Sequence, residues 1–204
     1  MLDPPPKVVG IFLLYMQKRL IFGVGYNDET CNSDSQAYIY WQNMLKRCYC
    51  KPRLKKFPTY NGCSVCDEWK TFSSFKAWFD KNHIDGYDID KDILVKGNKI
   101  YGPDTCCFVP KRINYLFINN RKARGKFPIG VSYHSGHKKF QAAINHEFKT
   151  VHIGYYKTPE EAFLAYKRTK ESYIQQLAKE YYESGAITKR VYDALMRYKI
   201  EISD

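Results

Sequence analysis

Carboxylates that could bind a metal ion are concentrated in one short segment of the chain. Asp88, Asp90 and Asp92 lie between two turn signals, Asp85-Gly86 and Gly97-Asn98. Side chains two residues apart in a strand point to the same face, so Asp90 and Asp92 would share one. This arrangement is compatible with a divalent cation held by carboxylate oxygens, and equally with exposed carboxylates that lie near lysines.

The cysteines offer a second kind of metal chemistry. The sequence has seven of them, including the two-residue-spaced pair Cys63 and Cys66. Four thiolate-rich ligands around a structural Zn²⁺ would brace a small, loop-rich unit. The favoured ligand set is Cys48, Cys63, Cys66 and Cys106. The alternative is that these residues are buried free thiols.

Charge and composition point to a polyanionic partner and to a reducing compartment. The chain of 204 residues has 33 Lys and Arg against 21 Asp and Glu, for a net charge of +12. Such a balance favours attraction to nucleic acid, and equally describes a solvated lysine-rich surface. An odd number of cysteines disfavours a fully paired secreted disulfide framework, so we expect a cytoplasmic protein, associated with the nucleoid when it is bound to DNA.

No membrane partner is expected from the hydropathy pattern. The apolar stretch from Val8 to Met16 is interrupted by Gly10. It is far shorter than the roughly 20 residues that cross a bilayer. The start of the chain, where Pro4, Pro5 and Pro6 follow Asp3, is unlike a secretory signal.

Patterns in the first half of the chain predict a mixture of strands and helices. The expected elements are a hairpin over Val8–Tyr15 and Leu20–Tyr26, a helix from Asp34 or Ser35 to Cys48, an aromatic helix over Glu68–Asn82, a strand, loop and strand over Tyr87–Lys99, and a short helix over Val109–Phe117.

The second half predicts a small sheet covered by a helix. Three strands are expected at Ile129–Tyr133, Lys139–Asn145 and Thr150–Tyr155. The sequence Thr158-Pro159-Glu160-Glu161 is a capping box with proline at the first helical position. A last helix is expected from Thr188 to about Lys199.

The second half also resembles the Apetala-two/ethylene-response-factor DNA-binding domain, over roughly residues 124–175. The matching segments are Pro128-Ile129-Gly130-Val131, Lys139-Phe140-Gln141-Ala142-Ala143-Ile144, His152-Ile153-Gly154-Tyr155-Tyr156-Lys157-Thr158-Pro159-Glu160-Glu161-Ala162 and Ala165-Tyr166. This resemblance implies that three antiparallel strands lie in the major groove of double-stranded DNA, while a helix packs on their other face.

Strand alternation then predicts which side chains would meet DNA. If Phe140, Ala142 and Ile144 face the helix, Gln141 and Asn145 face outward. The predicted DNA-binding residues are Ser132, His134, Lys138, Lys139, Gln141, Asn145, Lys149, Thr150 and His152, together with Arg121, Lys122 and Arg124 of a basic linker. Plant-type domains carry Arg and Trp at several of these positions, so no target sequence is carried over. Gln and Asn can bond adenine edges, so a tolerance for A·T pairs is expected.

Residues 38–116 resemble the N-terminal half of phage HNH-type homing endonucleases. The matching segments are Trp41, Met44 and Arg47-Cys48-Tyr49; Val65-Cys66-Asp67-Glu68-Trp69; Phe72 and Phe75; and Ile89-Asp90-Lys91-Asp92-Ile93, Gly97-Asn98 and Tyr101-Gly102-Pro103-Asp104-Thr105-Cys106. The resemblance implies a metal-dependent nuclease that uses Mg²⁺ or Mn²⁺, with a histidine as general base.

The histidine that such a site needs is absent from its expected place, where Lys91 follows Asp90. A protonated lysine is not a general base unless its pKa is strongly lowered. His83 is a substitute seven residues earlier. The predicted catalytic set is His83, Asp90, Lys91, Asp92, Asn98 and Asn114.

Taken together, these patterns predict an α+β protein. It comprises an HNH-like, ββα-containing unit over residues 1–118, a basic linker over 119–127, the sheet-and-helix unit over 128–183 and a helical tail over 184–204. The expected function is sequence-selective binding of double-stranded DNA by a phage HNH-type endonuclease. The alternatives are a catalytically inactive DNA-binding regulator and a phage-encoded module that binds a protein partner or inhibits host defence.

Overall fold

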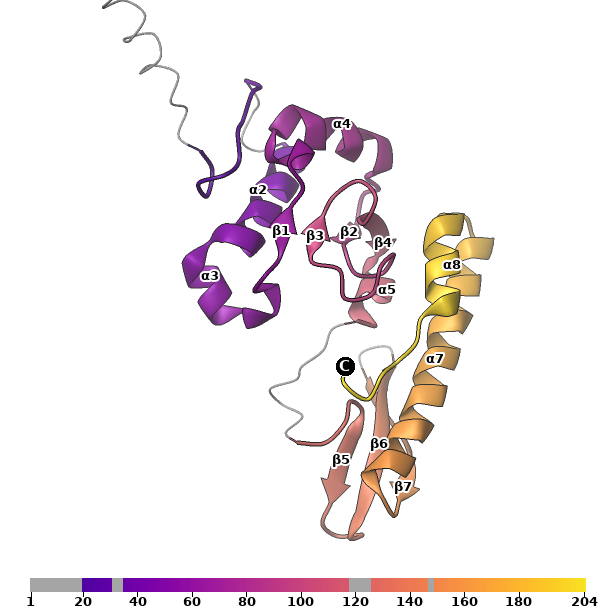
Figure 1. Cartoon of the computed structure of the whole chain (residues 1–204). Helices are drawn as coiled ribbons and strands as arrows, with labels where there is room; N and C mark the ends of the chain where they lie inside the picture. The colour runs from indigo at the N-terminus through magenta and orange to yellow at the C-terminus, as the bar shows by residue number, and fades with distance from the viewer. Residues whose placement is uncertain (1–19, 31–34, 118–125, 147–148) are drawn as a thin grey trace, which may run out of the picture. The chain divides into compact units, whose positions relative to one another are not determined.

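A computed structural model describes residues 20–30, 35–117, 126–146 and 149–204 (Figure 1). The chain divides into two units, each formed from two pieces of sequence. The first unit consists of residues 1–83 and 97–106, and the second of residues 84–96 and 107–204. Both units mix helices with small sheets, so the predicted α+β class is confirmed at this level.

The first unit is built on helix α2 (Gln36–Tyr49). Its predicted start is confirmed, because the Ser35 hydroxyl accepts a hydrogen bond from the Tyr38 backbone N–H and so caps the first turn. Helical spacing places Trp41 and Leu45 on one side, where both are fully buried. The short helix α3 (Lys51–Lys56) follows and buries none of its residues.

The predicted helix over Glu68–Asn82 is interrupted. Residues Glu68–Lys70 form a single 3₁₀ turn, η2, and the helix proper, α4, spans Phe72–Asn82. Thr71 between them is extended, because Tyr26 bridges to it and exchanges backbone hydrogen bonds with its two neighbours, Lys70 and Phe72. The pairing with Tyr26 therefore overrides the helical pattern at this point.

Aromatic side chains from α2, η2 and α4 form the core of the first unit. Trp41, Trp69, Phe72 and Phe75 are all fully buried. The Trp41 indole N–H donates to the Trp69 carbonyl at 2.7 Å, which satisfies a polar group inside this core. These aromatics are therefore structural.

The segment before α2 is a turn and not the predicted strand. Between Leu20 and Tyr26 the chain reverses, with a bridge from Ile21 to Gly25. Gly25 lies against α2 so closely that an added Cβ would meet the Leu45 side chain at 2.4 Å. The other half of the predicted hairpin, Val8–Tyr15, lies outside the described residues.

A two-stranded sheet completes the first unit. Strand β1 (Ser64–Val65) pairs in parallel with β3 (Ile100–Tyr101), and the 3₁₀ turn η1 (Pro58–Tyr60) precedes β1.

The second unit begins with an antiparallel pair and a short helix. Strand β2 (Tyr87–Asp90) pairs with β4 (Cys107–Pro110), and Ile89 lies opposite Phe108. Of the strand, loop and strand predicted over Tyr87–Lys99, the first strand is confirmed as β2, but the second begins only at Ile100. Strand β2 pairs with a strand much later in the chain. Helix α5 spans Lys111–Tyr115 and is shorter than predicted, since its expected first residues belong to β4.

The predicted three-stranded antiparallel sheet is confirmed. Its strands are β5 (Val131–His134), β6 (Lys139–His146) and β7 (Lys149–Tyr156), with β6 in the centre. Helix α7 (Pro159–Glu183) covers one face, and α8 (Lys189–Arg197) packs against α7.

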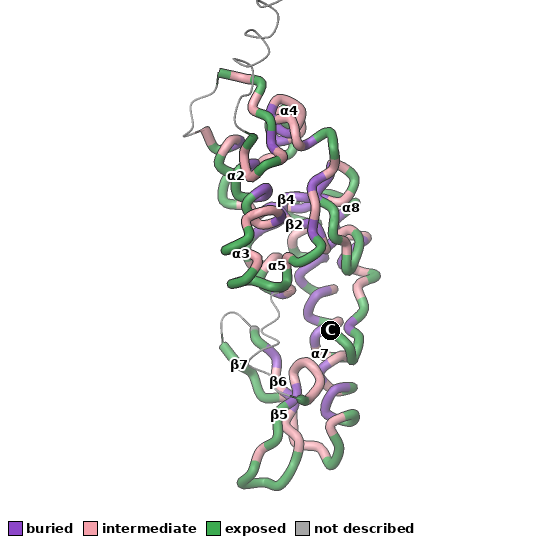
Figure 2. Tube along the Cα trace, turned by 60° about the vertical axis from the view of Figure 1, so that its left-hand side comes forward, coloured by how far each residue is buried: buried purple, intermediate pink, exposed green. Residues whose placement is uncertain are grey.

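The start of α7 follows the sequence signal closely. The Thr158 hydroxyl accepts from the Glu161 backbone N–H, and the Glu161 carboxylate accepts from the Thr158 backbone N–H in return. Figure 2 shows the buried residues of α7 along one side of the helix. Its first half covers the sheet, and its second half joins a core with α8, β4 and α5.

The division into units does not follow the expected boundary at residue 118. Strand β4 and helix α5 share a hydrophobic core with α7 and α8, through buried residues such as Val109 and Ile113, and Tyr87 of β2 donates a hydrogen bond to the Ala186 carbonyl. Arg112 on α5 also pairs with Glu180 on α7 at 3.2 Å. Among the helices that the structure describes, none has the length and apolar character of a membrane span.

Candidate nucleic-acid interface

One face of the β5–β6–β7 sheet is sealed by α7. Val131, Ala142 and Ile144 are buried on this inner face, opposite Ala162 and Tyr166 of the helix. The helix lies so close that a Cβ added at Gly130 would meet the Tyr166 ring at 2.0 Å. The predicted alternation along β6 is therefore confirmed.

The other face presents a row of polar side chains across all three strands, here called the outer face. Residues directly opposite each other in antiparallel strands point to the same side. Gln141 on β6 lies between Ser132 on β5 and Tyr155 on β7. Farther along β6, Asn145 lies opposite Thr150. Ser132, Asn145 and Thr150 are exposed, and Gln141 is half-buried.

Hydrogen bonding on this face orients one amide and leaves donors available. The Thr150 hydroxyl donates to Asn145 Oδ1 at 3.1 Å, and within the described residues the amide nitrogen of Asn145 has no hydrogen-bond partner. Among the described residues, the Gln141 side chain makes no hydrogen bond. Two amides on the central strand can therefore still bond to a ligand.

A β-bulge changes which residues of β7 join the outer face. The register shifts between Ala142 and Ala143, where His152 pairs with Ala143 but Gly154 pairs with Ala142. Ile153 is the extra residue, so the alternation restarts and Tyr155 faces outward with His152. Strict alternation from His152 places Tyr155 on the inner face, which is why the sequence did not identify it.

Tyr155 is the centre of a cluster with three histidines. Its ring centroid lies 4.4 Å from those of His137 and His152, and 5.2 Å from that of His134. His134 Nδ1 accepts a hydrogen bond from the His137 backbone N–H at 3.3 Å, which fixes the turn between β5 and β6. His137 also joins the outer face, although it is not among the contacts that strand alternation predicts.

Lysines lie at the β5–β6 end of the outer face, whereas Lys149 precedes the outward-facing Thr150 on β7 and is turned away by strand alternation. Lys138, Lys139 and Lys149 are all exposed, and none forms an ion pair within the described part of the chain. Lys138 has a positive φ of 51°, and together with Gly136 it closes the tight turn between β5 and β6. The predicted linker contacts Arg121, Lys122 and Arg124 lie outside the described residues.

The predicted catalytic residues are divided between the two units. His83 and Asn98 belong to the first unit, and the other four belong to the second. The His83 ring stacks on Phe79 with centroids 4.3 Å apart, at the end of α4. The Asn98 side chain bonds both backbone groups of Ile100 and so forms a local turn.

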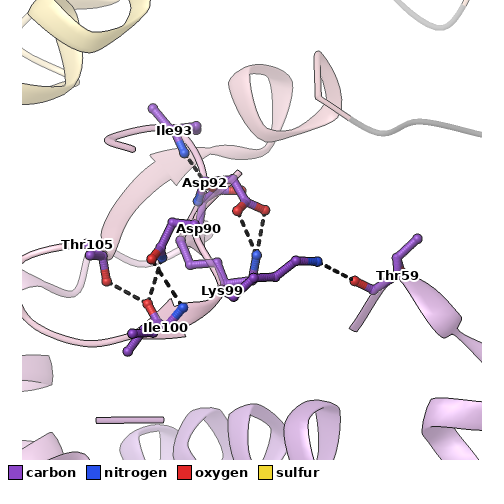
Figure 3. A network of polar contacts seen from close by, with 9 residues as sticks. Thr59, Asp90, Asp92, Ile93, Lys99, Ile100 and Thr105 are labelled. Carbon is purple, nitrogen blue, oxygen red and sulfur yellow. Dashed lines mark hydrogen bonds and ion pairs between the residues drawn. The ribbon is translucent and has the colours of Figure 1, made fainter. Parts of the chain in front are cut away.

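Asp90 ends β2 and caps the loop that follows it (Figure 3). Its carboxylate accepts the backbone N–H groups of Asp92 at 2.6 Å and Ile93 at 2.8 Å. Burial raises the pKa of Asp90, and the two N–H donors oppose that shift. The carboxylate therefore fixes the path of the chain after the strand.

The neighbouring polar groups are also paired. Lys91 is buried, and its ammonium group lies 2.7 Å from both carboxylate oxygens of Asp92. The Asn114 amide on α5 donates to the Asp88 carboxylate at 3.1 Å, which joins the helix to β2.

The four predicted zinc ligands all belong to the first unit. Cys48, Cys63 and Cys106 are buried, and Cys66 is half-buried with its pKa raised by burial. Across the described residues, no three His, Cys, Asp or Glu side chains are grouped so as to hold a metal ion. The zinc site stays a prediction.

Comparisons with known proteins found no matching family model, no curated protein and no solved structure.

Proposed function

We propose that this protein binds double-stranded DNA through the outer face of the β5–β6–β7 sheet and selects its site by contacts to base edges in the major groove. The observation that carries the proposal is the position of Gln141 and Asn145 on the outer face of the central strand. Their amides can form paired hydrogen bonds with adenine, the contact that gives these residues specificity for A·T pairs.

The dimensions of the sheet suit this role. The outer strands of a three-stranded sheet are separated by roughly 10 Å, because neighbouring strands lie about 4.8 Å apart. The major groove is about 12 Å wide and accepts β structure as well as helices. Since α7 covers the inner face, the sheet would enter the groove as a rigid element.

Charge supports the same assignment. The exposed lysines Lys138 and Lys139 border the polar row, where they would contact phosphates while the amides contact bases. The resemblance to the Apetala-two/ethylene-response-factor domain adds a second line of support, because that domain places the same strands in the groove.

The test is a selection of bound sequences from a random duplex library, performed with the full chain. We expect a preferred site containing A·T pairs. The substitution Gln141→Ala should relax the preference at one position, at a cost of about 1–3 kcal/mol in discrimination. The matched control is Gln176→Ala, which removes an exposed amide from α7. A library that shows no preference with the unmodified chain would reject the proposal.

Metal-dependent cleavage of the bound DNA is a second candidate function, favoured by the antiparallel pair β2–β4 followed by α5 and by the resemblance to HNH nucleases. It predicts nicking of plasmid DNA in Mg²⁺ or Mn²⁺ that is lost in both His83→Ala and Asp90→Ala. Binding of DNA without nicking would support the alternative of a catalytically inactive DNA-binding regulator. Recovery of a stoichiometric protein partner, with no shift of DNA on a gel at low salt, would instead support a module that binds a protein partner or inhibits host defence.

A further inference from the structure

The first unit contains a long stretch of sequence that has basic but no acidic residues. Between Gln36 and Cys66 there is no Asp or Glu. The same stretch holds six cationic residues, namely Lys46, Arg47, Lys51, Arg53, Lys55 and Lys56. Four of them belong to the six-residue helix α3.

Burial does not explain this concentration of charge in α3. The helix buries no residue, and Figure 2 shows it exposed or half-buried along its length. Lys51 occupies the first turn, where the helix dipole disfavours a cation, and it is four residues from Lys55, a spacing at which like charges repel. Arg53, Lys55 and Lys56 lie in the last turn, where the helix dipole favours cations, so the dipole opposes only Lys51.

Several lysines elsewhere in the described residues form ion pairs. Lys70, Lys76, Lys96 and Lys189 each pair with a carboxylate at 2.6–2.8 Å. Within the described residues, no carboxylate pairs with Lys51, Arg53, Lys55 or Lys56. Their charge is therefore available to an external anion.

An exposed aromatic ring lies among these cations. Phe57, the residue after α3, is 38% exposed. The guanidinium carbon of Arg53 lies 4.8 Å from the centre of this ring, and the Lys56 ammonium lies 5.6 Å from it. Arg53 Nε is buried and has no hydrogen-bond partner in the described structure, so this donor also lacks an acceptor.

We infer that Lys51, Arg53, Lys55, Lys56 and Phe57 form a second DNA-contacting surface, the α3 surface, which binds the sugar–phosphate backbone without reading its sequence. The inference rests on the proposed function, because it assigns to the first unit the backbone contacts that accompany site selection by the sheet. Cations bind phosphate oxygens, and an apolar ring between them packs against the sugar.

The experiment compares two variants of the full chain that carry the same net charge. The first, Lys51→Gln with Lys55→Gln, changes exposed residues of the α3 surface. The second, Lys81→Gln with Lys179→Gln, changes exposed lysines outside it. Binding to the selected duplex and to a scrambled duplex of equal length is measured from 50 to 300 mM salt.

We expect the α3 variant to lose roughly tenfold or more in affinity at 0.1 M salt, equally for both duplexes, since each lost phosphate contact lowers the slope of log K against log salt by about 0.9. The control variant should keep the wild-type slope. Thermal melting of both variants checks that they remain folded.

The outcomes separate this inference from the proposed function. An α3 variant that binds with the wild-type slope overturns the α3 surface even if the sheet still selects a sequence. Loss of affinity in that variant, without any sequence preference in the unmodified chain, overturns the role of the sheet and supports the α3 surface. Failure of the unmodified chain to bind either duplex at 50 mM salt overturns both.

Discussion

Two regions of the second unit carry many polar side chains and use them in opposite ways. On the outer face of the β5–β6–β7 sheet, Gln141 and Asn145 keep hydrogen-bonding groups without a partner among the residues that the structure describes. Around β2, β4 and α5, the carboxylates of Asp88, Asp90 and Asp92 all bond to neighbouring groups of the same chain. Polar residues held by their own fold are structural, whereas polar residues left unpaired on a rigid face are available for recognition.

The largest effect is expected for a substitution at Gly130, where the sheet packs closely against α7. Gly130→Ala should lower the free energy of unfolding by about 3 kcal/mol or more, because the new Cβ would collide with the Tyr166 ring and the backbone φ is +75°. The matched control is Gly185→Ala, which has a similar φ of +71° but open space around it and should cost about 1 kcal/mol. Chemical denaturation measures both. Equal losses would mean that the close approach of α7 contributes nothing.

Substitution of Lys170 tests the buried side of α7, the helix that packs against both the β5–β6–β7 sheet and the region of β4 and α5. Burial lowers the pKa of this lysine to about 8, from an ordinary value of 10.5. Between these two pH values the unfolded chain binds the proton more tightly than the folded chain, so stability should rise as the pH increases from about 8 to 10.5. Lys170→Met should raise the free energy of unfolding at pH 7 by about 2 kcal/mol and remove this rise. Melting temperatures across that pH range check the prediction, and an unchanged profile would contradict it.

The stability of two Asp90 variants tests the structural interpretation of β2, in which the carboxylate caps the loop after the strand. The amide oxygen in Asp90→Asn can still accept the N–H groups of Asp92 and Ile93, so the folded state should be as stable as the wild type at pH 7. Asp90→Ala loses both acceptors and should cost about 1–2 kcal/mol. Denaturation curves of the two variants make the comparison. If the asparagine variant were as unstable as the alanine variant, the capping role would be wrong.

The smallest effect concerns the link between α5 and β2. Asn114→Ala removes one partly buried hydrogen bond to Asp88 and should lower the free energy of unfolding by about 1 kcal/mol. If the proposed DNA binding by the outer face is correct, this variant should bind DNA as the wild type does, which a gel-shift titration would show. A loss of binding without a loss of stability would place Asn114 in the recognition site.

Much of the second half of the chain could be predicted because its signals are local. Thr158 and Glu161 form the expected capping box, and the apolar residues of β6 alternate as the sheet requires. Each of these features depends on residues within a few positions of one another. Ser35 at the start of α2 and Thr188 at the start of α8 are further examples, since a cap acts only on the first turn.

Only the tertiary structure decided the features that depend on distant pairing. Strand β2 pairs with β4 across an intervening loop, and the bulge at Ile153 turns Tyr155 outward. The protonation preferences of Asp90 and Lys170 likewise follow from burial by residues far away in the sequence. The sequence by itself therefore determined the caps, the alternation and the excess of positive charge. Long-range packing determined which polar groups are already bonded and which remain available, because hydrogen-bond partners and desolvation arise only when distant segments meet.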